Sequence, residues 1–245
     1  NGSPIKFVGE QGGVISANAN KDFIQNKAFS GTLLTKKGSG WLKTYASGES
    51  LGRAIIVAGA IDNFSGNAAK VVEFQGGTLI DEFGTNNELN IPKGKTGTWN
   101  TATRATYTNK VTGEGSLDIY CAGEQGSGWV ATRTPLQLNL TAFKGTIVPH
   151  ATIAADGRFT LDTNNGSEHC TFNIPEDVYV QNSGKTFRIG KLTGKGSLGG
   201  FCSFRNGVTA QTNTWQVGND KDFKFEGIVT SNDNFTKVGT GEMTV

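Results

Sequence analysis

The sequence predicts an all-β fold, a right-handed parallel β-helix with an internal repeat of about 80 residues. Three observations support this prediction. The composition favours strands and turns, short segments alternate apolar with polar residues, and several phrases recur at one common interval. The whole chain, 1–245, is expected to form a single solenoid domain.

The composition favours strands and turns over helices. Gly, Thr and Asn fill 35, 29 and 21 of the 245 positions, and these residue types are common in turns and strands. Leu136, Leu138 and Leu140 alternate strictly with polar residues, as a half-buried strand requires. No segment shows a sustained helical period of apolar residues.

One glycine-rich phrase occurs four times along the chain. It reads LTKKGSGWL at 34–42, VTGEGSL at 111–117, LTGKGSL at 192–198 and FTKVGTGEM at 235–243. A unit that cannot bury its own apolar face stacks on its neighbour, so recurrent residues occupy recurrent positions. The phrase therefore indicates a solenoid.

Other residues repeat at nearly the same interval. The separations are 81 residues for Gly115 and Gly196, 82 for Phe143 and Phe225, and 83 for Ile91 and Ile174. Tyr45, Tyr120 and Phe201 are expected to share one core position. The alternative is two tandem immunoglobulin-like sandwiches, which also contain short strands at regular spacing.

The repeat predicts units at approximately 28–110, 111–191 and 192–245, after a probable N-terminal cap over 1–27. We expect roughly ten coils of about 25 residues and a body about 50 Å long. Because the phrase recurs close to Val245, the last coil is expected to be an open edge. The chain is accordingly expected to be a fragment that meets neighbouring repeats of a longer protein.

The phrase at 235–243 resembles the autotransporter-associated β-strand repeat, whose core reads roughly L-T-K-x-G-x-G-x-L-x-L. The segment 34–42 is similar, with Gly38 and Gly40 at the paired glycines. The copies at 111–117 and 192–198 depart from the pattern because Gly replaces the Lys. The resemblance implies a right-handed β-helix exposed by a bacterium at its surface or outside the cell, without any implied enzyme activity or cofactor.

Charge and motifs exclude several classes of function. The formal net charge is +2, with the charged residues dispersed, so no basic stripe for nucleic acid is expected. No apolar run is long enough for a membrane span. No motif indicates a cofactor or a metal, and the spacing of the three cysteines fits no zinc site. Cys121, Cys170 and Cys202 are expected to be buried thiols; one disulfide is the alternative.

The functional prediction is a non-catalytic structural or adhesive module of the cell surface, with glycans or host-surface components as partners. Trp99, Trp129 and Trp215 are the candidate binding residues, because aromatic faces are platforms for sugar rings. For any single one of them, the competing and favoured interpretation is a side chain that caps the core at a corner of a coil. The alternative is a β-helical polysaccharide lyase or glycoside hydrolase. Such enzymes need convergent carboxylates, whereas the acidic residues here are mostly isolated.

Overall fold

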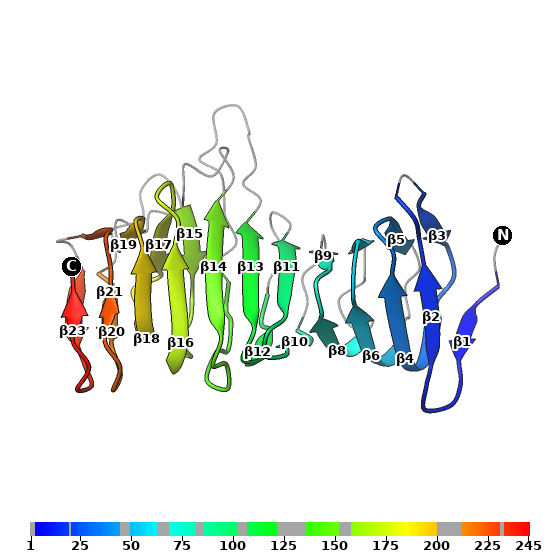
Figure 1. The fold of residues 1–245 in the computed structure, drawn as a ribbon, viewed down its shortest axis with the longest axis horizontal. Helices are drawn as coiled ribbons and strands as arrows, with labels where there is room; N and C mark the ends of the chain where they lie inside the picture. The colour runs from blue at the N-terminus through cyan, green and yellow to red at the C-terminus, as the bar shows by residue number, and fades with distance from the viewer. Residues whose placement is uncertain are drawn as a thin grey trace.

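The computed structural model of the chain confirms an all-β parallel solenoid (Figure 1). It describes residues 3–19, 21–44, 50–62, 69–81, 86–101, 107–121, 136–151, 158–199, 212–230 and 233–245. Within these ranges every regular element is a β-strand, and the paired strands run parallel to one another. The strands stand side by side along the long axis, from the N-terminus at one end to the C-terminus at the other (Figure 1).

An eleven-stranded sheet runs almost the whole length of the body. Its strands, in order from the C-terminal end, are β23 (Asn234–Lys237), β20 (Thr214–Val217), β18 (Thr186–Gly194), β16 (Ser167–Ile174), β14 (Thr146–Ala151), β13 (Ser116–Cys121), β11 (Thr96–Thr101), β9 (Thr78–Asp81), β7 (Ala60–Asp62), β5 (Trp41–Thr44) and β3 (Phe23–Gln25).

Three smaller sheets form the other faces. The seven-stranded sheet contains β1 (Ile5–Phe7), β2 (Gly13–Ser16), β4 (Phe29–Lys37), β6 (Ser50–Ile56), β8 (Ala69–Phe74), β10 (Glu88–Ile91) and β12 (Lys110–Gly113). The four-stranded sheet contains β15 (Arg158–Leu161), β17 (Tyr179–Asn182), β19 (Ser197–Leu198) and β22 (Ile228–Val229). The two-stranded sheet pairs β21 (Phe223–Lys224) with β24 (Met243–Thr244).

The register corrects the predicted size of a coil. Leu42 pairs with Ile61, Ile61 with Leu79 and Leu79 with Trp99, at separations of 19, 18 and 20 residues. A turn therefore holds roughly 20 residues rather than 25, although the turns from β13 to β14 and from β14 to β16 are longer, at 30 and 25 residues. Eleven stacked strands at about 4.8 Å per step span about 48 Å, close to the predicted length. The sandwich alternative is wrong, because it requires antiparallel sheets.

The sequence repeat is also a structural repeat, displaced by one face of the solenoid. Ile91 pairs with Gly113 in the seven-stranded sheet, and the equivalent Ile174 pairs with Gly194 in the eleven-stranded sheet. Likewise, β9, β11, β13 and β14 of the eleven-stranded sheet correspond to β15, β17, β19 and β22 of the four-stranded sheet. One unit of the sequence repeat thus covers three turns plus the part of a turn that leads from one sheet to the next.

The core is a column of apolar side chains inside the turns. Trp99, Ile119 and Leu79 lie in adjacent strands and are at most 1% exposed. Successive strand residues face opposite sides of a sheet, so Tyr120, next to Ile119, points outward and is 39% exposed. The predicted core position is therefore wrong for Tyr120. Tyr45 and Phe201 lie outside the described residues.

Candidate functional site: a basic groove beside a β-bulge

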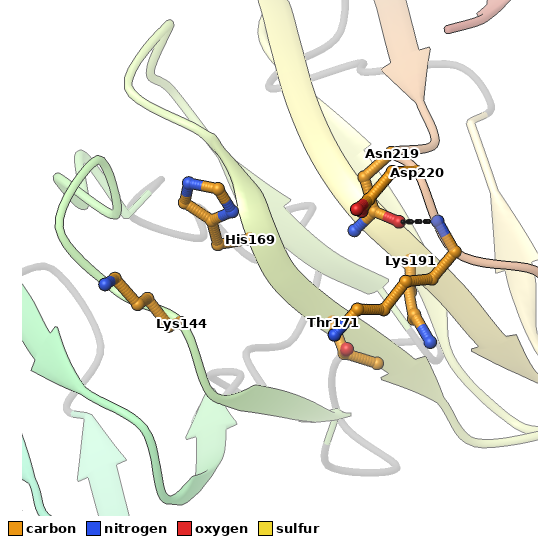
Figure 2. Close-up of a pocket in the computed structure, with 7 residues that line it drawn as sticks. Lys144, His169, Thr171, Lys191, Asn219 and Asp220 are labelled. Atoms are coloured by element: carbon orange, nitrogen blue, oxygen red, sulfur yellow. Dashed lines mark hydrogen bonds between the residues drawn. The ribbon is translucent and has the colours of Figure 1, made fainter. Parts of the chain in front are cut away.

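A groove of about 490 Å³ opens across four successive turns near the C-terminal half of the body (Figure 2). Its lining comes from the corner before β14, from β16 and β18, and from the corner after β20. Lys144 and His169 lie on one side of the opening, and Asn219 and Asp220 on the other (Figure 2). The lining residues are Lys144, His169, Thr171, Lys191, Asn219, Asp220 and Lys221.

A β-bulge in β16 shapes one side of the groove. Ser167 pairs with Ile189 and Thr171 with Lys191, so a step of four residues in β16 faces a step of two in β18. The two extra residues break the regular alternation, and the His169 side chain emerges 57% exposed while its neighbour Cys170 is buried. Bulges commonly redirect side chains beside binding sites.

Two neighbouring residues accommodate the bulge. A Cβ on Gly190 would overlap the carbonyl oxygen of Glu168, so only glycine lets β18 pass this close to the bulged strand. From the next turn, Asn219 Nδ2 donates to the same carbonyl at 3.1 Å. Asn219 Oδ1 in turn accepts the backbone N–H of Lys221 at 2.9 Å (Figure 2). Three consecutive turns thus build the part of the groove around the bulge.

Positive charge predominates in the groove. Among the lining residues that the structure describes, Lys144, Lys191 and Lys221 contribute three ammonium groups, and Asp220 contributes one carboxylate. In the described part of the chain, no carboxylate oxygen lies within 4.0 Å of these three lysine nitrogens. The three lysines and Asp220 therefore give the described lining a net charge of +2, and these lysines have no ion-pair partner within the described ranges.

Two acidic residues, Glu168 and Asp222, directly flank the lining in the sequence. Asp222 accepts the backbone N–H of Glu242 at 2.7 Å, and Glu168 lies beside a cation. The Glu168 carboxylate lies 3.6 Å from His169 Nε2 and 3.7 Å from Arg188 Nη2. Arg188 offsets the charge of Glu168, so Glu168 does not neutralise the groove lysines. A single unpaired carboxylate in the lining, that of Asp220, does not form the carboxylate pair of a glycosidase.

A second polar cluster lies on the outer face of the eleven-stranded sheet. His150 Nε2 is 2.7 Å from Asp118 Oδ1, and the His150 ring stacks on Tyr120 with centroids 4.1 Å apart and planes 3° from parallel. Tyr120 and His150 are register partners, which explains the stacking. The Asp118 hydrogen bond fixes the orientation of an imidazole that is itself partly exposed.

The predicted tryptophan platforms are corrected by the structure. Trp99 and Trp215 are 0% exposed, so neither ring offers a face to a sugar. Both lie at inward positions of strands, where a large aromatic side chain fills the core. Trp215 Nε1 donates to Asp233 Oδ2 at 2.8 Å. Trp129, the third candidate, lies outside the described residues.

Sequence reasoning did not select the residues that the structure brings together. Lys144, His169, Lys191 and Asn219 are 25, 22 and 28 residues apart, and each interval is one turn. Polar residues that recur at intervals of one turn are the sequence signal for such a groove. This signal can be recognised only when the number of residues per turn is already known. Trp41, which was not selected either, is 40% exposed and carries Lys43 Nζ 5.1 Å from its ring centroid.

Comparisons with protein-family models, curated proteins and solved structures found no match to this chain. Across the described ranges, no group of three or more His, Cys, Asp and Glu side chains is arranged to hold a metal ion. No helix in that part of the chain has the length and hydrophobicity to cross a membrane. Cys170 is a buried free thiol, as expected, whereas Cys121 at the end of β13 is only partly buried, and Cys202 falls outside the described residues.

Proposed function

We propose that this chain is a polysaccharide-binding module of the bacterial cell surface or the extracellular space, and that the groove beside the β16 bulge is its binding site. The observation that carries the proposal is the groove itself, with ammonium, amide, hydroxyl and carboxylate groups on four adjacent turns. Many polysaccharides are linear, and all are rich in hydroxyls, so a solenoid that repeats its polar groups along an axis suits them. The resemblance to the autotransporter-associated repeat supports the proposed location.

Binding to a panel of soluble polysaccharides, measured by affinity electrophoresis and calorimetry, tests the proposal. We expect saturable binding that weakens when Lys191, in the groove, is replaced by Ala. Lys70 is an exposed lysine of the seven-stranded sheet, away from the groove, and Lys70→Ala is the matched control. Binding that responds equally to both substitutions, or no binding to any polymer, would contradict the proposal.

A β-helical polysaccharide lyase or glycoside hydrolase is the second candidate, favoured by one observation. The Asp118–His150 hydrogen bond orients a partly exposed imidazole, as a general base requires. New reducing ends or unsaturated products formed by the purified chain, and lost in His150→Ala, would establish this activity. Products that persist in His150→Ala would remove the Asp118–His150 pair from consideration.

A further inference from the structure

We infer that the ligand of the groove is an acidic polysaccharide, a chain whose sugars carry carboxylate or sulfate groups. This inference rests on the proposed polysaccharide binding and specifies its chemistry. Among the described lining residues, three lysine ammonium groups face one carboxylate, and of the two flanking carboxylates, those of Glu168 and Asp222, the first is offset by Arg188 at 3.7 Å. A neutral glycan would leave two positive charges without a counter-charge, whereas an anionic chain supplies it.

The spacing of the lysines favours a polymer over a single small anion. Lys144 precedes β14, Lys191 lies in β18 and Lys221 follows β20. From β14 to β20 the sheet advances by three strands, which is about 14 Å along the axis at the usual strand spacing. One sulfate or carboxylate cannot contact charges so distributed, but repeated anionic groups on one chain can. The ligand therefore runs along the solenoid axis, across the strands.

The type of cationic side chain in the groove is consistent with an acidic polysaccharide as the ligand. The positive groups that line the groove are lysines, while the nearby arginine, Arg188, is engaged with Glu168. Lysine presents a compact, mobile charge and does not impose the planar two-point geometry of arginine. Such groups can follow anionic substituents whose positions vary along a flexible glycan. We therefore expect moderate affinity and a clear dependence on salt.

The remaining groups distinguish a glycan from a nucleic acid. Single-stranded nucleic acids are bound by aromatic rings on which bases stack, and the lining residues that the structure describes include no Phe, Tyr or Trp. The Asp220 carboxylate would repel a phosphate but can accept hydrogen bonds from sugar hydroxyls. Thr171, abreast of Lys191 in the register, adds a hydroxyl donor and acceptor beside the charges.

Pairs of polymers that share a sugar backbone but differ in charge show whether the groove recognises the charge or the backbone. We would compare polygalacturonate with its fully methyl-esterified form, and heparin with desulfated heparin, using calorimetry at several salt concentrations. These two pairs distinguish carboxylate from sulfate as the recognised group. We expect at least one acidic polymer to bind ten-fold or more tightly than its neutral or desulfated counterpart. Inorganic sulfate and free galacturonic acid should not saturate at concentrations where the polymer does.

Substitutions locate the site. Lys144→Gln, Lys191→Gln and Lys221→Gln should each weaken binding about two- to five-fold, the range of partly exposed ion pairs. The effects should multiply in the triple variant, while Lys70→Gln leaves the affinity unchanged. Asp220→Asn should strengthen binding of the acidic polymer, because it removes the one opposing charge. Circular dichroism of each variant checks that the fold is retained.

Each remaining outcome has a distinct meaning. If no polysaccharide binds, the proposed function itself is wrong. Equal binding of acidic and neutral polymers, with loss in the lysine variants, would keep the function but overturn the acidic ligand. Equal or tighter binding of poly(dT) would also overturn it, in favour of nucleic acid. An unchanged affinity in the triple variant would place the polysaccharide site elsewhere on the chain.

Discussion

Lys36 and Lys237 occupy the same position in two copies of the repeated phrase and fold back in the same way. Lys36 Nζ donates to the carbonyl oxygens of the next two residues, Lys37 and Gly38, at 2.8 Å each. Lys237 Nζ donates to those of Val238 and Gly239 at 2.9 and 3.1 Å. In both copies, the lysine of this phrase therefore stabilises the corner that follows it, through hydrogen bonds to two backbone carbonyl oxygens.

The two lysines differ in what lies beyond them. Lys36 also donates to Ala58 O on the following turn at 3.1 Å, and its side chain is completely buried. Lys237, in β23, is exposed. The lysine thus stabilises its own corner in both copies. Where a further turn stacks on that corner, as it does at Lys36, the lysine also links two turns.

Replacing Lys36 with Met should lower the free energy of unfolding by about 1–3 kcal/mol, because buried carbonyl oxygens lose their donor. Lys237→Met is the matched control, and its cost should stay within about 0.5 kcal/mol because water replaces the lost donor. Urea denaturation of both variants measures the difference. Equal losses in the two variants would show that the contact to Ala58 O and the burial of Lys36 contribute little.

The burial of Lys36 should also appear in the pH dependence of stability. Desolvation lowers the pKa of Lys36 from its ordinary value of 10.5. Between the lowered pKa and 10.5, the unfolded chain binds more protons than the folded chain, so stability should rise with pH there. The difference in unfolding free energy between the native chain and Lys36→Met, followed from pH 8 to 11, isolates this residue. A difference that falls with pH would contradict the sign.

Trp215 and Trp99 offer a matched test of one buried hydrogen bond. Both rings are fully buried, but Trp215 Nε1 donates to Asp233, whereas Trp99 Nε1 has no acceptor among the described residues. Replacement by Phe removes the same volume from each. Trp215→Phe should be more destabilising by about 1.5–3 kcal/mol, the value of a hydrogen bond to a charged group. Thermal and urea unfolding would reveal this difference, and equal losses would contradict it.

Gly190→Ala should disturb the bulge that shapes the groove. The added methyl would overlap Glu168 O, and relieving such overpacking typically costs about 1–3 kcal/mol. The displacement of β16 should also weaken polysaccharide binding. Thr193→Ala, on the same strand but partly exposed, is the control and should change neither property appreciably. Native stability and binding in Gly190→Ala would show that β18 can move away without consequence.

Cys170 should resist alkylation in the folded protein. Its side chain is completely buried, and desolvation raises the pKa of the thiol far above its ordinary value. The thiolate is the reactive form, so iodoacetamide should modify Cys170 only after denaturation. Peptide mass mapping before and after unfolding gives the result. Rapid modification at neutral pH without denaturant would show that this strand opens readily.

The fold class and the repeat could be read from the sequence because both are properties of local pattern. The alternation from Leu136 to Leu140 correctly places the three leucines in the core, although this segment makes only isolated β-bridges and no strand. The interval between Ile91 and Ile174 requires equivalent environments. The length of a turn could not be read in this way. One unit advances by three turns and one face, so the repeat interval is not a whole number of turns.

The sequence by itself determined which residues repeat, but only the tertiary structure decided which of them face outward together. Trp99 and Trp215 lie at inward positions of their strands, and their burial depends on strand register rather than on neighbouring residue types. The basic groove arises because Lys144, Lys191 and Lys221 come from different turns and meet only when those turns stack. The shape of the groove depends further on the bulge in β16. This bulge cannot be recognised from a period in the sequence, because a bulge is defined by its mismatch with the partner strand.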